Sequence, residues 1–182
     1  MTINTPKNIL TCYQDFVTES WKIEGLKLKR IPLQNIVDYH ISFINNDEIS
    51  VKSLSHAALK FTNGYGKLRD KPGMNVRVGG HVPIAGGSDI VKLLEKMCGI
   101  AQGTNAFDLH RNFEDIHPFM DGNGRVGRML WAWSMRHDPI ALERGFLHSW
   151  YYQSLSASRQ NNDNAEVVDL ADATIDMNGS RV

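Results

Sequence analysis

One segment of twelve residues, from His117 to Arg128, gathers the side chains best suited to chemistry in this chain. It reads His-Pro-Phe-Met-Asp-Gly-Asn-Gly-Arg-Val-Gly-Arg. The unperturbed pKa of histidine is about 6.5, so His117 can act as a base at neutral pH. The two arginines are fixed cations, and the glycines free backbone amides beside them. This combination is what a polyphosphate needs, so we interpret the segment as a phosphate site with a base.

Three other glycine-containing motifs are excluded. Gly122, Gly124 and Gly127 fit G-x-G-x-x-G, but that dinucleotide fingerprint needs a preceding buried strand, and the residues here have helical periodicity. Asp121 and Asn123 open like a calcium loop, but the ligand, glycine and glutamate required at its fifth, sixth and twelfth positions are missing. The Gly-Lys-Ser/Thr of a P-loop is absent as well.

What remains is a turn that leads into the N-terminus of a helix. The amides of residues 122–124 would point outward there, and the helix dipole adds partial positive charge. Arg125 and Arg128 are three residues apart and share one helix face, which suits two phosphates. Asp121 can hold a Mg²⁺ that bridges phosphate oxygens, because Mg²⁺ often takes only one or two carboxylates.

The elements that must position this segment are mostly helical. Apolar residues recur at helical spacing, and caps or breakers bound them. The pattern predicts about seven helices, near residues 5–25, 33–44, 50–62, 90–97, 105–116, 124–136 and 146–158. The first helix should begin at Thr5-Pro6 and end at Gly25, and the second should follow Pro32. We therefore expect an all-α domain.

The segment 64–87 differs from the rest. It contains seven glycines and two prolines, and Val76-Arg77-Val78 alternates as a strand would. We predict an exposed, hairpin-like loop. A connection of this length inside a compact domain is uncommon and is often functional.

Bulk composition sets limits on the class of protein. With 182 residues, of which 42% are hydrophobic and 22% charged, we expect one soluble globular domain with a tail. Twenty basic and twenty acidic residues balance each other, so the chain lacks the overall positive charge that is typical of nucleic-acid-binding proteins, and nucleic acid is not favoured as a partner. Cys12 and Cys98 are typical of reduced thiols in a cytoplasmic protein, although their spacing does not exclude a single disulfide between them. No apolar run approaches the ~18 residues of a membrane span, and the first twenty residues resemble neither a signal peptide nor an anchor.

The segment resembles the Fic family motif, His-Pro-Phe-x-Asp/Glu-Gly-Asn-Gly-Arg-x-x-Arg, at every defined position. Leu109-His110-x-x-Phe113-Glu114-x-Ile116 is similar to the helix that precedes the motif in that family. The stretch Val76-Arg77-Val78-Gly79-Gly80-His81-Val82-Pro83 is similar to its flap, and Tyr151-Tyr152 looks like its late helix near the adenine. The resemblance covers roughly residues 10–160.

This resemblance implies a Fic fold and a protein adenylyltransferase, which moves AMP from ATP to a Ser, Thr or Tyr hydroxyl of a target protein. His117 would be the general base, and Asp121 would bind Mg²⁺ or Mn²⁺. The triphosphate and adenine would be bound by Gly122, Asn123, Gly124, Arg125, Arg128 and Tyr152, with Arg125 on the β-phosphate and Arg128 on the γ-phosphate. A target segment would dock at the flap, formed by Val76, Arg77, Val78, Gly79, Gly80 and His81, by strand addition.

A second motif, Ser20-Trp21-Lys22-Ile23-Glu24-Gly25, resembles the family's inhibitory helix motif, Ser/Thr-x-x-x-Glu-Gly/Asn. In relatives the glutamate pairs with the second arginine, here Arg128, and displaces the γ-phosphate. Inhibition would then act in cis, with no separate antitoxin chain. We expect residues 1–30 to form an inhibitory segment packed on the core, 31–160 to form the Fic core, and 161–182 to be a polar tail or short helix.

Alternatives stay open at this stage. The same site could remove AMP from a modified target, with Glu24 orienting a water. A nucleotide-sensing binding module is a third hypothesis, which the intact His117 and Asp121 disfavour. Transfer of UMP or phosphocholine and a homo-oligomeric state are not excluded by the motif.

Overall fold

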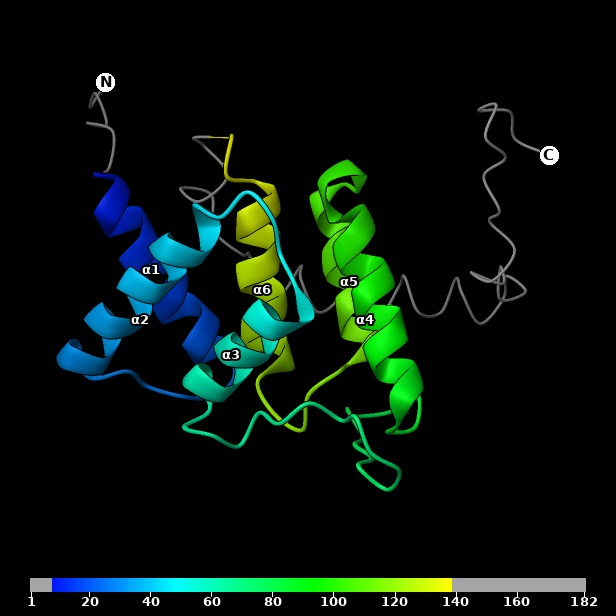
Figure 1. The fold of residues 1–182 in the computed structure, drawn as a ribbon. Helices are drawn as coiled ribbons and strands as arrows, with labels where there is room; N and C mark the ends of the chain where they lie inside the picture. Colours follow the sequence, from blue (N-terminus) through cyan, green and yellow to red (C-terminus); the bar gives the residue numbers. More distant parts are fainter. Residues whose placement is uncertain (1–7, 139–182) are drawn as a thin grey trace, which may run out of the picture. The chain divides into compact units, whose positions relative to one another are not determined.

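The structure, a computed structural model, describes residues 8–138 of the chain. The predicted helix 146–158, with Tyr152, and the predicted tail lie outside the described residues. Within them the chain forms six α-helices, a short 3₁₀ helix and no named strand (Figure 1). The elements are α1 (Ile9–Ile23), α2 (Arg30–Ile44), α3 (Val51–Phe61), α4 (Ser88–Ile100), η1 (Ala101–Gly103), α5 (Ala106–Ile116) and α6 (Asn123–Ser134).

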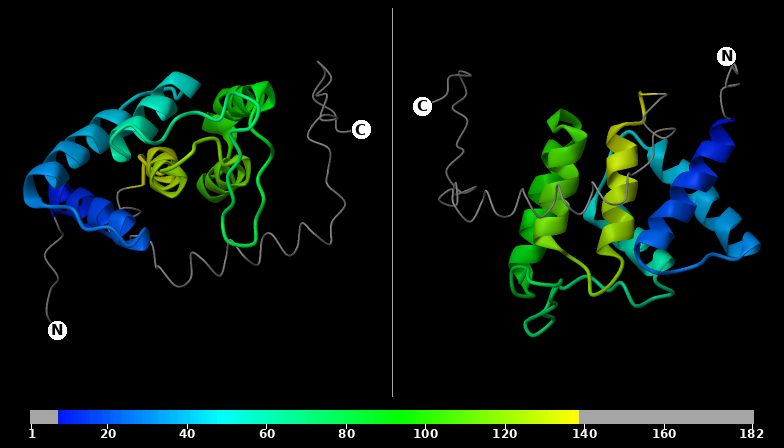
Figure 2. Two further views of the ribbon diagram at one scale, coloured as in Figure 1. Left: turned by 90° about the horizontal axis from the view of Figure 1, so that it is seen from below. Right: turned by 180° about the vertical axis from the view of Figure 1, so that it is seen from behind.

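Helix α6 is the centre of this arrangement. It packs against α5, α3, α2 and α1, while α4 packs against α5 and α3. Figure 2 shows α6 between α5 on one side and the helices α1, α2 and α3 on the other. Nine of its twelve residues are buried, including both motif arginines. The motif residues of α6 therefore lie in the middle of the bundle, and the N-terminal end of α6 faces the candidate site.

Two residues determine where helix α1 begins and ends. Asn8 caps its start by accepting a hydrogen bond from the amide of Leu10 at 3.0 Å, so the helix begins later than the predicted start at Thr5-Pro6. Gly25 ends the helix at a φ of 71°, with the amides of Gly25 and Leu26 donating to Lys22 and Trp21 at 2.9 and 3.0 Å. The helix therefore ends at Ile23, with Glu24 as its C-cap residue directly before Gly25.

Two other helices differ from the predicted bounds. Helix α2 begins at Arg30, which places Pro32 inside its first turn, where no amide hydrogen is needed. Helix α4 runs from Ser88 to Ile100 and is longer than the predicted 90–97. Helices α3, α5 and α6 lie close to their predicted positions.

The loop between α3 and α4 holds a single antiparallel pair, so the hairpin predicted there is not confirmed. Val78 and His81 exchange both main-chain hydrogen bonds, at 3.0 and 2.9 Å, across the Gly79-Gly80 turn. The next hydrogen-bonded pair would join Val76 to Pro83. Proline has no amide hydrogen, so the ladder stops after one pair.

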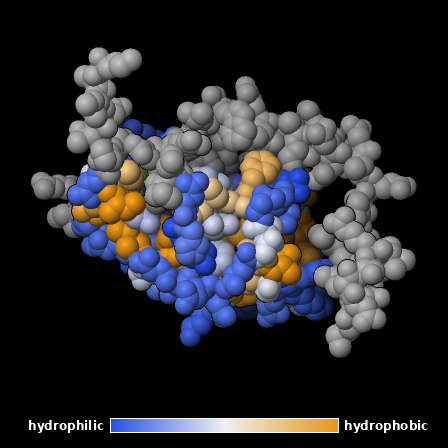
Figure 3. All heavy atoms as spheres, turned by 90° about the horizontal axis from the view of Figure 1, so that it is seen from above, coloured by the Kyte–Doolittle hydropathy of each residue, from blue (hydrophilic) through white to orange (hydrophobic). Residues whose placement is uncertain are grey.

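The surface of the described part mixes polar and apolar side chains. On the face in Figure 3 the apolar residues form several separate patches among polar ones. The exposed large apolar side chains come from different elements, among them Ile9 in α1, Leu59 in α3 and Ile100 in α4. None of the helices described here has the length and apolar character of a membrane span.

Candidate active site

His117 stands at the end of α5 in an unusual backbone conformation. It is the C-cap residue, with φ 49° and ψ 59°, and its amide donates to the carbonyl of Phe113 at 2.9 Å. A non-glycine residue rarely adopts this left-handed conformation. Such backbone strain persists only where the surroundings hold it, and Pro118 follows at once. The turn ends the helix and directs the chain toward α6.

Arg69 binds this turn, and no motif in the sequence marks it. Its side chain is fully buried. Nε donates to the carbonyl of His117 at 2.8 Å and Nη2 to that of Ile116 at 3.1 Å, while Nη1 donates to Met74 at 3.2 Å and Ile84 at 2.9 Å. One guanidinium therefore joins the end of α5 to the loop before α4.

The short loop from His117 to α6 is braced by Asn123. The side chain of Asn123 is buried, accepts a hydrogen bond from the amide of Phe119 at 2.9 Å and donates to its carbonyl at 2.7 Å. Phe119 is fully buried and anchors the loop in the core. The structure therefore places the Asn123 side chain on the loop itself, while its backbone amide stands at the N-terminus of α6.

Asp121 and Arg125 interact across the first turn of α6. Oδ1 of Asp121 accepts hydrogen bonds from the amide of Gly122 at 2.6 Å and from Nη2 of Arg125 at 2.9 Å. Nη1 of Arg125 donates to the carbonyl of Phe61 at 2.6 Å, and its guanidinium lies 5.7 Å from the ring centre of Trp21. The Asp121 side chain is 53% exposed, and its Oδ2 has no hydrogen-bond partner among the described residues.

Arg128 is held by the end of α1. Its Nε donates to Oγ of Ser20 at 2.8 Å, and Nη2 donates to the carbonyl of Ser20 at 2.9 Å and to Oε1 of Glu24 at 2.5 Å. The Arg128 side chain is 1% exposed and that of Glu24 is 31% exposed. The structure thus brings Ser20, Glu24 and Arg128 together, and Gly25 caps the helix that presents the first two.

A carboxylate also faces the candidate base. Oε2 of Glu114 lies 3.7 Å from Nδ1 of His117, and both side chains are largely buried. A negative charge in this place stabilises the imidazolium that forms when a histidine accepts a proton. Glu114 lies in the last turn of α5, and His117, its C-cap residue, follows three positions later, which is close to one helical turn.

Two further histidines near Arg128 are buried and neutral. Burial, together with a smaller effect of the Arg128 charge, lowers the pKa of His40 to about 3. The pKa of His110 is lowered to about 3 as well. Burial is the main cause, a hydrogen bond with the backbone of Gly127 acts in the opposite direction, and the charge of Arg128 adds to the lowering. Neither side chain gains a proton near neutral pH, so neither is suited to proton transfer there.

The glycines of the motif allow neighbouring side chains to lie close to the backbone at the start of α6. Gly122 is the N-cap of α6 at φ 85°, and a Cβ there would lie 2.7 Å from Cγ2 of Thr62. A Cβ on Gly124 would overlap Oε1 of Glu24 and lie 3.0 Å from Nη1 of Arg128. The space in front of the α6 N-terminus is thus closed from one side by the carboxylate of α1.

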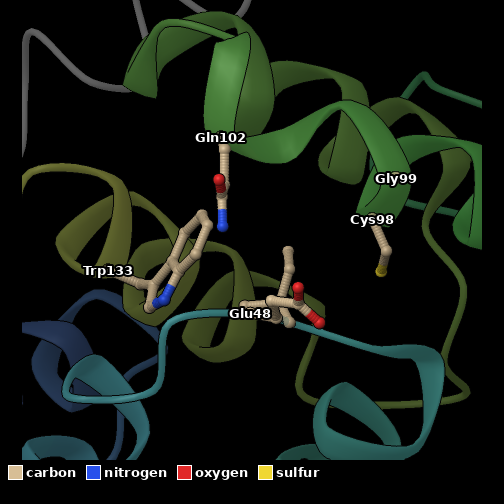
Figure 4. Close-up of a pocket in the computed structure, with 6 residues that line it drawn as sticks. Glu48, Cys98, Gly99, Gln102 and Trp133 are labelled. Atoms are coloured by element: carbon tan, nitrogen blue, oxygen red, sulfur yellow. The ribbon is translucent and has the colours of Figure 1, made fainter.

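A separate pocket of about 300 Å³ lies near the other end of α6 (Figure 4). Its lining residues are Glu48, Ile49, Cys98, Gly99, Gln102 and Trp133. Trp133 is ten residues after Asn123, which corresponds to about 15 Å along a helix. This pocket is therefore distinct from the His117 to Arg128 segment.

The remaining predicted residues fall into two groups. The flap residues 76–81 lie in the loop that Arg69 ties to the end of α5, through the carbonyls of Met74 and Ile84 on either side of them. Tyr152 lies outside the described residues. Among those that are described, no cluster of three or more His, Cys, Asp or Glu side chains could hold a metal alone.

Comparisons with known proteins agree on one family. Residues 47–135 match the model of the Fic/DOC family. "Protein adenylyltransferase Fic" from Culex quinquefasciatus is 31% identical over 111 residues, which are 54% of this chain and 22% of the relative, so the chain spans about a fifth of that protein.

A solved structure supports the same fold. The crystal structure of a Fic family protein from Desulfovibrio desulfuricans G20 has a TM-score of 0.60 and 20% identity, and the match covers 86% of this chain and 60% of that one. The predicted all-α Fic fold is thereby confirmed, apart from the flap hairpin.

Proposed function

Because this chain carries a Fic/DOC family domain, we propose that it is a protein adenylyltransferase that Glu24 holds in an inhibited state. The observation that carries the proposal is the contact between Arg128 and the end of α1. Arg128 is the second arginine of the motif and is the cation assigned to the γ-phosphate. In this structure its donors are directed at Ser20 and Glu24.

The proposed reaction transfers the AMP group of ATP. A hydroxyl oxygen of the target attacks the α-phosphorus, and the bond between that phosphorus and the bridging oxygen breaks, so pyrophosphate leaves. His117 takes the hydroxyl proton, and Glu114, 3.7 Å from its Nδ1, stabilises the resulting imidazolium. The N-terminus of α6, with the amides of Asn123 and Gly124, stabilises the negative charge that develops on the phosphate, while the amide of Gly122 donates to Asp121.

Asp121 fits the role of a magnesium ligand. One carboxylate oxygen is engaged with Gly122 and Arg125, while the other has no partner among the described residues and the side chain is half exposed. Mg²⁺, or Mn²⁺ in its place, takes one such carboxylate together with phosphate oxygens and water. When bound, the ion supplies charge neutralisation between the phosphates.

The geometry of Arg128 supports the proposed inhibition. Three of its hydrogen bonds go to α1, and the guanidinium is almost fully buried. A γ-phosphate would have to displace Glu24, whose carboxylate carries the same sign of charge. ATP in the presence of Glu24 would therefore bind without its γ-phosphate on Arg128, and the α-phosphorus would lie out of line with the attacking hydroxyl.

The segment 1–30 thus acts in cis, and no separate antitoxin chain is needed for inhibition. Helix α1 is also part of the core, with Phe16, Val17 and Trp21 buried. We propose that activation moves Glu24 away from Arg128 without removing α1 from the bundle. The target docks at the flap residues 76–81, in the loop that Arg69 ties to the carbonyl of His117.

The test is transfer of label from nucleotide to protein. Purified Glu24→Gly protein is incubated with each of the four α-labelled nucleoside triphosphates, and the modified residue is located by mass spectrometry. The proposal predicts self-modification by AMP with ATP and a divalent ion. A folded Glu24→Gly protein that gains no nucleotide from any of the four would overturn it.

The reverse reaction is a second candidate. Oε2 of Glu24 has no hydrogen-bond partner among the described residues and can orient a water toward a phosphorus held at α6. In that case wild-type protein would release AMP from a protein modified beforehand, and Glu24→Gly would not. Release by both or by neither would remove this candidate.

A further inference from the structure

Arg69 is a buried cation that the proposed mechanism does not use. Its side chain is fully buried in the loop between α3 and α4. Within the described part of the chain, four main-chain carbonyl oxygens accept its hydrogen bonds and no carboxylate does. Burying a charge is costly unless it is hydrogen-bonded. An arginine here therefore depends on this particular set of acceptors.

Two of these acceptors form the end of α5. The carbonyls of Ile116 and His117 lie 3.1 and 2.8 Å from Nη2 and Nε. A helix end leaves its last carbonyls unpaired and carries partial negative charge, so a cation is stabilising there. The guanidinium thus holds the backbone of the residue whose left-handed conformation aims the candidate base.

The other two acceptors close the base of the flap loop. Nη1 donates to the carbonyls of Met74 and Ile84, which bracket the flap residues. Asn75 adds a second closure, since its Oδ1 accepts a hydrogen bond from the amide of Gly86 at 2.9 Å. The same planar group is therefore bonded to the flap on one side and to His117 on the other.

The backbone around Arg69 joins the same two parts. The amide of Arg69 donates to the carbonyl of Pro118, and the amide of Met120 donates to that of Lys67, both at 2.9 Å. Leu68 and Phe119 face each other as an antiparallel bridge. Arginine has five N–H donors in a rigid fork, whereas lysine has three on one atom and cannot span both sides.

We propose that Arg69 is a positioning residue for the transfer reaction, which holds the backbone of His117 and the base of the flap in one fixed arrangement. The inference rests on the proposed function, in which His117 takes a proton and the flap holds the target. Arg69 contacts none of the residues assigned to the phosphates. Its loss should therefore affect transfer and leave nucleotide binding in place.

The experiment compares Arg69→Lys and Arg69→Met with Lys67→Met, all in the Glu24→Gly background. Lys67 is a matched control, because it is an exposed cation on the same segment. NMR measures the Cα and Cβ chemical shifts and the amide–Hα coupling of His117, which report its left-handed conformation. Transfer from α-labelled ATP and the dissociation constant of ATP are measured on the same samples.

In both Arg69 variants we expect the His117 signals to leave their left-handed values and transfer to fall by roughly 10- to 100-fold. ATP affinity should stay within about twofold, and Lys67→Met should match its parent. Unchanged His117 signals, or changed signals with full transfer, would overturn the inference. Unfolding of both Arg69 variants would assign Arg69 to stability and also overturn it.

The two proposals fail separately in this design. If the Glu24→Gly parent transfers no nucleotide, the proposed function fails. The same result leaves Arg69 without a reaction to position, whatever the His117 signals show. If the parent transfers and Arg69→Lys is equal to it, the positioning role alone is wrong.

Discussion

Oε1 of Glu24 lies 2.5 Å from Nη2 of Arg128, although 104 residues separate the two in the chain. The pair joins the end of α1 to the middle of α6. Arg128 is nearly fully buried, while the Glu24 side chain is one-third exposed. The partly exposed carboxylate of Glu24 thus covers the buried guanidinium of Arg128. Glu24 can move away from Arg128 without exposing the core.

Ser20 shares in this contact, so its hydroxyl should contribute to inhibition. Ser20→Ala removes the acceptor of Arg128 Nε and keeps the carbonyl that Nη2 uses. Losing one hydrogen bond to a charged group weakens the hold on Arg128, and transfer from α-labelled ATP should rise roughly three- to tenfold. The rise should be smaller than in Glu24→Gly. A Ser20→Ala protein with wild-type activity would show that the hydroxyl has no share.

His117 should be required for transfer and dispensable for nucleotide binding. In the Glu24→Gly background, His117→Ala should lower transfer at least about 100-fold, since it removes the proposed base. ATP affinity, measured by calorimetry, should remain within about twofold of the parent. His137→Ala is the control, because His137 is an exposed histidine at the end of the described chain. Retained transfer in His117→Ala would contradict the assignment.

Gly127 sets the close approach of α5 and α6. A Cβ there would lie 2.5 Å from Oε1 of Glu114 and 2.9 Å from the ring of His110. Gly127→Ala should therefore destabilise the fold by about 1–3 kcal/mol and lower Tm by several degrees. Gly99→Ala is the matched control in α4, where no atom lies within 4 Å of the added Cβ. It should raise stability by about 0.5–1 kcal/mol, and equal Tm changes would refute the packing argument.

Burial of His40 makes the stability sensitive to acid. The folded-state pKa is about 3, below the value of about 6.5 for an unfolded chain, so the unfolded state binds the proton first as pH falls. The stability is complete above about pH 6.5 and is lost as pH falls toward 3. His40→Leu should therefore lose less free energy of unfolding between pH 7 and 5 than wild type, measured by urea denaturation. A His40→Leu slope equal to that of wild type would show that burial of His40 has no share in the acid sensitivity.

Much of the fold and the grouping of the motif followed from the sequence. Apolar periodicity located α3, α5 and α6, because each buries one face against the bundle. The sequence predicts that α1 begins at Thr5-Pro6, which is a good cap by residue type, while Asn8 supplies the cap in the structure. The sequence predicts a helix boundary at Pro32, but a proline is equally suited to the first turn, where Pro32 lies.

The contacts that hold the site could not be predicted in the same way. Arg69 has no signal in a sequence motif, because its four acceptors are main-chain carbonyls up to 48 residues away. The left-handed conformation of His117 depends on that network. The side chain of Asn123 pairs with the main chain of Phe119, a contact that its place in the motif does not indicate. In each case the partner is a backbone group, and backbone groups leave no trace in residue types.

The measurement that tests the central claim most directly compares transfer by wild type, Glu24→Gly and Lys22→Gly. All three are incubated with α-labelled ATP and Mg²⁺, and label on protein is counted. Lys22 is exposed in the last turn of α1, so Lys22→Gly is the control for the loss of helix stability that a new glycine causes, and it keeps Glu24. The account predicts roughly tenfold or more label on Glu24→Gly than on either other protein. Equal labelling of Glu24→Gly and wild type would show that the Glu24–Arg128 contact does not inhibit the site.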